Sequence, residues 1–84
     1  MAQDVRQLVG GNVRRVREAA GLTQAELAAR LEVDRAYISG LELGARNATI
    51  MTLWLVAQAL QVAVSELFAG AEAPSAQRQR KRGH

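Results

Sequence analysis

The chain carries a single proline, Pro74, so no proline interrupts a helix anywhere before that position. Along this stretch apolar residues recur at spacings of three and four, which is typical of one face of a helix. The Asn-Gly and Asp-Gly dipeptides that favour β-hairpins are absent, whereas alanine and leucine are abundant. The sequence therefore predicts an all-α fold.

The first helix is expected over residues 5–20, and Gly21 lies where a left-handed C-terminal turn would end it. Gly10 and Gly11 interrupt this segment, and each disfavours a helix by about 1 kcal/mol relative to alanine. Two alternatives follow. Either a neighbour packs closely against these glycines, or the helix begins at Asn12 as its cap.

Two short helices are expected next, over residues 24–31 and 35–43. Thr23 and Glu26 have the spacing of a capping box, in which each side chain bonds the other residue's amide. Asp34 is expected to cap the second of these helices, and Gly44 to end it. The turn between them has the length found in a helix-turn-helix, whose second helix enters the DNA major groove.

A fourth helix is expected after Thr49, with a fifth over residues 63–68. The spacing predicts that the fourth helix buries Ile50, Leu53, Val56, Ala57 and Leu60. An 84-residue chain suits one domain, which we place over residues 1–70, followed by a disordered tail over 71–84.

The formal net charge of +3 arises entirely in this tail, because residues 1–70 contain seven arginines and seven acidic residues. The basic cluster of the tail is expected either to solvate the terminus or to add nonspecific attraction to phosphates. Nucleic-acid binding by the folded part must therefore depend on where its charges lie.

Residues 21–28, Gly-Leu-Thr-Gln-Ala-Glu-Leu-Ala, are followed by Val33-Asp34, by residues 37–39 and 41–42, and by Gly44. This pattern closely resembles the lambda-repressor-like (Cro/cI-type) DNA-binding family, from about Val9 to Phe68. Within that family, residues 37–40 and 46–47 look most like the controller proteins of restriction–modification systems. The resemblance implies a compact five-helix domain that binds double-stranded DNA at a palindromic operator as a homodimer, in the cytoplasm.

The candidate DNA-binding residues are Gln24, Arg35, Ala36, Tyr37, Ser39, Gly40, Arg46 and Asn47. Arg35 opens the recognition helix, where an arginine can donate a bidentate pair to guanine; alternatively it is solvated and paired with Asp34 or Glu32. Glycine inside a helix indicates that something approaches its backbone, and at Gly40 this is either DNA or the preceding helix.

The other candidates also have two interpretations each. Gln24 either marks a phosphate site at a helix N-terminus or is simply an exposed polar residue. Ala36 either contacts a thymine methyl or is merely exposed. Tyr37 contacts the DNA or packs on the helix surface. Arg46 and Asn47 lie in the loop after the recognition helix, where an arginine is usually just solvated, whereas the resemblance implies contacts to the DNA backbone.

The resemblance also implies a pairing between Arg17, near the end of the first helix, and Glu42 of the recognition helix. We expect a partly buried, charge-assisted pair that holds the recognition helix in place.

The fourth helix carries Trp54 and Leu55 where relatives of this family carry polar residues. Isolated exposed apolar residues are common, but a group of them indicates an interface. The predicted homodimer interface consists of Met51, Trp54, Leu55, Val64 and Phe68.

The sequence thus predicts a transcriptional regulator, and the alternative is an antitoxin that binds a toxin through the fourth helix and the tail. An enzyme is not expected, because the one histidine is His84 and no histidine of the folded part can activate a serine. Without cysteines or a ligand cluster, neither a metal nor another cofactor is expected. No apolar run approaches the length of a membrane span.

Overall fold

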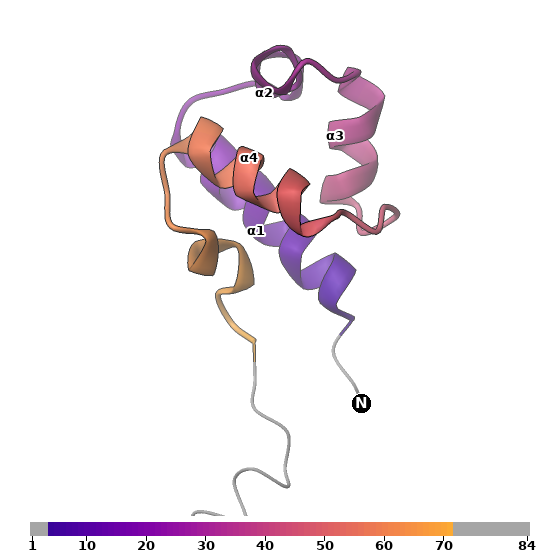
Figure 1. The fold of residues 1–84 in the computed structure, drawn as a ribbon, viewed down its shortest axis with the longest axis vertical. Helices are drawn as coiled ribbons and strands as arrows, with labels where there is room; N and C mark the ends of the chain where they lie inside the picture. The colour runs from indigo at the N-terminus through magenta and orange to yellow at the C-terminus, as the bar shows by residue number, and fades with distance from the viewer. Residues whose placement is uncertain (1–3, 72–84) are drawn as a thin grey trace, which may run out of the picture.

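The structure is a computed structural model that describes residues 4–71, so the predicted tail beyond Ala71 lies outside the described residues. Its elements, in chain order, are α1 (Val5–Ala19), α2 (Gln24–Leu31), α3 (Arg35–Glu42), α4 (Ile50–Leu60) and the 3₁₀-helix η1 (Val64–Phe68). In Figure 1, α2 and α3 lie at the upper end, α4 crosses in front of α1, and η1 lies below α4. Residues 4–71 contain no strand, which confirms the all-α class.

Most of the helices begin and end at the capping residues and glycines that the sequence predicted. Thr23 and Glu26 form the predicted capping box, and the Thr49 hydroxyl accepts from the Thr52 amide at 3.0 Å. Gly21 and Gly44 adopt positive φ values of 77° and 80° just after α1 and α3. Asp34 occupies the N-cap position of α3, but its side chain makes no capping hydrogen bond, so that prediction was wrong.

Close packing of α1 against α3 explains why residue 10 is a glycine. The helix α1 begins at Val5 after the cap Asp4, so the alternative start at Asn12 is wrong. A Cβ built at Gly10 would lie 2.7 Å from the Glu42 carbonyl oxygen and closer still to that of Leu41. Nothing lies within 4 Å of the corresponding position at Gly11. Gly10 therefore lets the backbone of α3 approach α1.

Two predictions about the C-terminal half need correction. The fifth helix is a 3₁₀-helix rather than an α-helix, because its amides bond three residues back, as from Glu66 to the Ala63 carbonyl at 2.9 Å. Ile50 was expected in the core, yet 87% of its surface is exposed. It lies in the first turn of α4, and the side chains that this helix buries begin farther along, at Val56.

The core lies where all these elements meet. Its buried apolar residues are Val9, Val13, Val16, Leu27, Ala28, Ile38, Leu41, Val56, Ala57, Leu60 and Leu67. The buried Asn12 side chain ties η1 to α1 by donating to the carbonyls of Leu67 at 3.0 Å and Ala69 at 2.9 Å. Among residues 4–71, no helix is both long and apolar enough to cross a membrane.

Candidate nucleic-acid interface

The helices α2 and α3 are joined by a tight turn that presents the start of α3 to solvent. Glu32 ends α2 in the left-handed conformation, with φ 59° and ψ 42°, and the Val33 amide donates back to the Ala28 carbonyl at 3.0 Å. The buried residues Ile38 and Leu41 anchor the inner face of α3. The first residues of α3, Arg35 and Ala36, are exposed.

A buried ion pair fixes α3 against α1. Arg17 donates to both carboxylate oxygens of Glu42, from Nε to Oε2 at 2.6 Å and from Nη2 to Oε1 at 3.0 Å. Its third donor, Nη1, bonds the Leu22 carbonyl at 2.7 Å. Donation to the Glu42 carboxylate raises the pKa of the Arg17 guanidinium above its ordinary value. The structure thus brings together the two residues whose pairing the family resemblance implied, in a bidentate geometry that fixes orientation as well as distance.

Gln24 belongs to the same network, which the sequence did not reveal. Its amide Nε2 donates to Glu42 Oε1 at 3.0 Å, and the side chain is half-buried. The alternative of a merely exposed polar residue is therefore wrong. The side chain binds inward, so only the backbone amides of this helix end remain for the predicted phosphate. Helical spacing cannot predict a contact across 18 residues.

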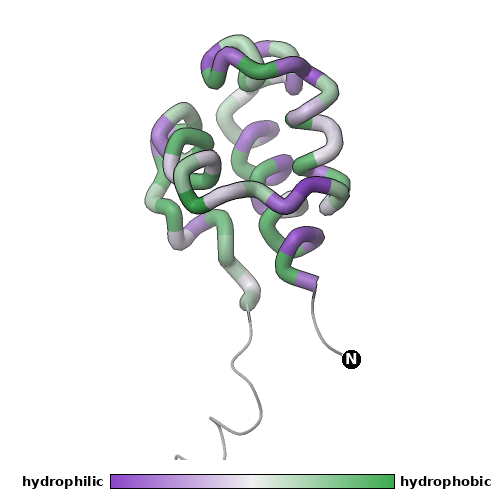
Figure 2. The backbone as a smooth tube through the Cα atoms, turned by 45° about the vertical axis from the view of Figure 1, so that its right-hand side comes forward, coloured by the Kyte–Doolittle hydropathy of each residue, from purple (hydrophilic) through white to green (hydrophobic). Residues whose placement is uncertain are grey.

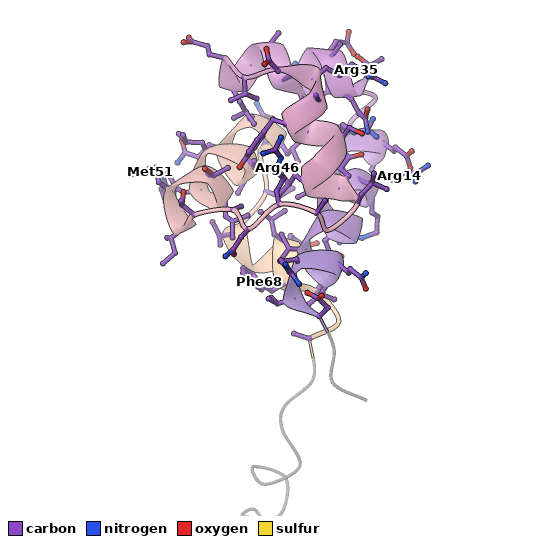
Figure 3. All side chains as sticks on the ribbon, turned by 90° about the vertical axis from the view of Figure 1, so that its right-hand side faces the viewer. Arg14, Arg35, Arg46, Met51 and Phe68 are labelled. Carbon is purple, nitrogen blue, oxygen red and sulfur yellow. The ribbon has the colours of Figure 1, made fainter. Side chains whose placement is uncertain are left out.

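The arginines of the described chain differ in how they are paired. Five of them bind an acidic side chain or a backbone carbonyl, namely Arg6, Arg14, Arg15, Arg17 and Arg30. Arg35 and Arg46 have no carboxylate partner among residues 4–71, so the alternative that pairs Arg35 with Asp34 or Glu32 is not formed. Figure 3 shows Arg35 near the upper end of α3, with Arg46 lower on the same side of the molecule.

Arg46 lies instead on an aromatic ring. Its guanidinium carbon is 5.3 Å from the centroid of the Tyr37 ring, within the range of a cation–π contact. The side chain also lies against Gly40, where a Cβ would be 3.1 Å from Arg46 Nε. Within the protein, the group that lies against Gly40 is thus the Arg46 side chain. The predicted alternative, a close approach of the preceding helix, is wrong.

The remaining candidates lie around these residues. Ala36 and Asn47 are exposed and Ser39 is half-buried. A shallow hollow runs along this edge, lined by Glu32, Val33, Asp34, Ala36, Tyr37 and Arg46. The structure therefore brings Ala36, Tyr37, Gly40 and Arg46 together at one edge of the molecule.

A second exposed surface is apolar. It consists of Ile50, Met51, Trp54, Leu55 and Phe68, and we call it the α4 face. Trp54 is 52% and Met51 63% exposed, whereas Val64, also predicted here, is half-buried against the core. In Figure 2 the tube of α4 is mostly in the hydrophobic colour, and in Figure 3 Met51 and Phe68 lie away from Arg35.

A family model described as helix-turn-helix matches residues 13–67. The chain belongs to the helix-turn-helix family. An uncharacterized HTH-type transcriptional regulator, y4dJ of Sinorhizobium fredii, is 50% identical over 64 residues, which are 76% of this chain and 83% of the relative. The predicted lambda-repressor-like relationship is thereby confirmed at the level of family.

Solved structures resemble this helix-turn-helix chain closely. The restriction-modification controller protein C.AhdI from Aeromonas hydrophila superposes with a TM-score of 0.71 at 37% identity, over 74% of this chain and 94% of that one. The controller protein C.Esp1396I, a tetramer in complex with its natural 35 base-pair operator, gives 0.70 at 34% identity, over 80% and 88%. The predicted likeness to restriction–modification controllers is also confirmed.

Proposed function

We propose that this helix-turn-helix protein is a sequence-specific transcriptional regulator that inserts α3 into the major groove of an operator. One relative is named a transcriptional regulator, and a similar structure holds its operator DNA. In the proposed role, Arg35 reads a guanine, Ala36 and Tyr37 contact base edges or the sugar–phosphate backbone, and Ser39, Arg46 and Asn47 bind nearby phosphates.

The single observation that carries this proposal is the pairing of the arginines. Residues 4–71 contain seven arginines and seven acidic residues, and five of the arginines bind a carboxylate or a backbone carbonyl. The two that bind neither, Arg35 and Arg46, lie at the start of α3 and in the loop that follows it. An arginine with free donors can bind phosphate or guanine without first breaking an ion pair. The backbone amides at the start of α2 offer a further phosphate contact.

The α4 face supports the proposal that the protein acts as a homodimer. A symmetric contact through Trp54 and Met51 would remove exposed apolar surface from water in both copies. Two copies can also present two recognition helices about 34 Å apart, one turn of the DNA helix. A dimer of this kind requires a palindromic operator.

The proposed place of action is the cytoplasm, and the proposed role is repression or control of the protein's own promoter region. The controller proteins to which the chain is similar favour this role over that of an antitoxin. No feature of residues 4–71 favours a toxin over a second copy of the chain as the partner of the α4 face.

The test is a mobility shift with the DNA upstream of the protein's own gene, using Arg35→Ala against Arg14→Ala. Both changes remove one exposed positive charge, but Arg14 lies on α1 and is paired with Glu18 at 3.2 Å. We expect Arg35→Ala to weaken the specific complex about tenfold to a hundredfold, the value of a guanine contact. Arg14→Ala should bind as the wild type does. An absent specific complex, or equal binding by both variants, would overturn the proposal.

A further inference from the structure

The end of α3 turns the chain back along its own helix. The Gly44 amide donates to the Leu41 carbonyl at 3.1 Å, and the Ala45 amide donates to the Gly40 carbonyl at 2.9 Å. With Gly44 in the left-handed conformation, this is the Schellman arrangement of a helix end. The residue that follows, Arg46, is thereby returned to the level of Gly40, one turn before the end of α3.

Gly40 leaves room for the stem of Arg46. A Cβ built there would lie 3.1 Å from Arg46 Nε, 3.2 Å from Cγ and 3.7 Å from Cδ. The first two distances are tighter than ordinary carbon contacts, so any side chain at this position would push the arginine stem outward. The glycine is otherwise unfavourable inside a helix. Its φ is not in the left-handed region, so the conformation of α3 does not require it.

The stem that rests on Gly40 carries the guanidinium to Tyr37. The ring lies one helical turn before Gly40 and is half-buried against the core, which restricts its orientation. The guanidinium carbon lies 5.3 Å from its centroid. Stacking leaves the N–H edges of the guanidinium free to donate, because a cation–π contact uses only the face of the group.

We propose that Gly40 is a positioning residue that holds Arg46 on Tyr37 before DNA binds, and that Gly40 itself is not a DNA contact. This inference rests on the proposed function, because it assigns the ordered guanidinium to a phosphate beside the recognition helix. Ordering a long side chain in advance removes part of the entropy cost of binding. An added Cβ at position 40 displaces the arginine stem from its place on the helix without removing the arginine.

The experiment is a double-mutant cycle between Gly40→Ala and Arg46→Ala, with Gly11→Ala as the matched control. Gly11 is also a helical glycine, and nothing lies within 4 Å of its built Cβ. Both glycine variants should be at least as thermally stable as the wild type, because alanine favours a helix. We expect Gly40→Ala to weaken operator binding about threefold to tenfold, as for the loss of one ordered side chain. Gly11→Ala should leave it unchanged.

The second half of the cycle separates the two explanations of Gly40. In an Arg46→Ala background, Gly40→Ala should cause no further loss, because the side chain that it displaces is gone. An equal loss in both backgrounds would mean that DNA approaches Gly40 directly, and it would overturn the inference. Unchanged binding by Gly40→Ala in the wild-type background would overturn it as well.

A measurement without DNA keeps this inference distinct from the proposed function. In the free protein, the Tyr37 ring should shift the NMR signals of the Arg46 side chain upfield, and Gly40→Ala should abolish that shift. If the shift is present and lost as expected but no operator is bound, the proposed function fails and the positioning holds. If Arg46 shows no ring shift in the wild type, the positioning fails whatever the DNA result.

Discussion

The helix-turn-helix side and the α4 face of this domain both expose residues that the fold does not need, but they are built differently. On the first side, Arg35 lies on α3 and Arg46 lies in the loop that follows it. Polar contacts hold the two helices of this side, through the capping box at Thr23 and the bidentate pair of Arg17 with Glu42. On the α4 face the exposed residues are apolar. Its helix is capped by Thr49 and held to the core by Val56 and Leu60.

The two sides therefore suit different kinds of partner. Hydrogen bonds and ion pairs have directional geometry, so they can hold charged groups in the arrangement that a DNA groove requires. Apolar burial has no direction and gains most from area, which suits a contact between two copies of the chain. The predictions that follow test this contrast.

The largest expected effect on stability comes from breaking the buried ion pair of Arg17 with Glu42. Glu42→Ala leaves the Arg17 guanidinium buried without its carboxylate, and we expect the free energy of unfolding to fall by about 3–5 kcal/mol. Urea denaturation measures this, and DNA binding should fall with it. Arg14→Ala, which breaks an exposed pair, should cost about 1 kcal/mol or less. Equal losses for the two variants would show that polar contacts do not hold the recognition helix.

The second effect concerns the α4 face. Trp54→Ala removes the largest exposed apolar group, and we expect the dimer dissociation constant to rise by about thirtyfold or more, as for a central aromatic residue of an interface. Analytical ultracentrifugation measures the constant. The matched control is Leu43→Ala, another exposed apolar residue but one that lies just after α3; it should leave dimerisation unchanged. A monomeric wild type would show that this face is not an interface between copies.

A smaller effect is expected from Gln24, whose amide holds one oxygen of Glu42. Gln24→Ala should lower the free energy of unfolding by about 1 kcal/mol, the value of a typical hydrogen bond, because Arg17 still binds the carboxylate. Thermal unfolding measures it. In the Glu42→Ala background, Gln24→Ala should lower the free energy of unfolding much less. An equal loss in that background would show that Gln24 stabilises the fold through another contact.

The smallest effect is a pH dependence. Hydrogen bonding from the Thr23 backbone amide lowers the pKa of Glu26 below its ordinary value. The capping box therefore adds stability above the unfolded-state pKa of about 4.3, and this stability is lost as the pH falls through the lowered folded-state value. Glu26→Gln should reduce the loss of stability between neutral pH and pH 3. If the free energy of unfolding of both proteins depends on pH in the same way, the capping box does not contribute to the loss of stability in acid.

Much of the fold follows from local signals. Thr23 and Thr49 begin α2 and α4 by accepting hydrogen bonds from amides three residues on. Gly21 and Gly44 follow the ends of α1 and α3 in the left-handed conformation. The ion pair of Arg17 with Glu42 was reached through a family resemblance, because no local pattern links residues 25 apart. Ile50 was misassigned because it shares the spacing of the buried side chains of α4 but lies in the first turn, before the part of the helix that packs on the core.

The linear sequence was enough to give the all-α class, most of the helix ends and the two short helices of the helix-turn-helix. These features depend on interactions within a few residues of the chain, which a linear pattern records. Only the tertiary structure decided that Gly10 admits the backbone of α3, that Gln24 binds Glu42, and that Arg46 lies on Tyr37 beside Gly40. Each of these depends on how closely separate segments approach in space, and that distance is set by the packing of the whole core.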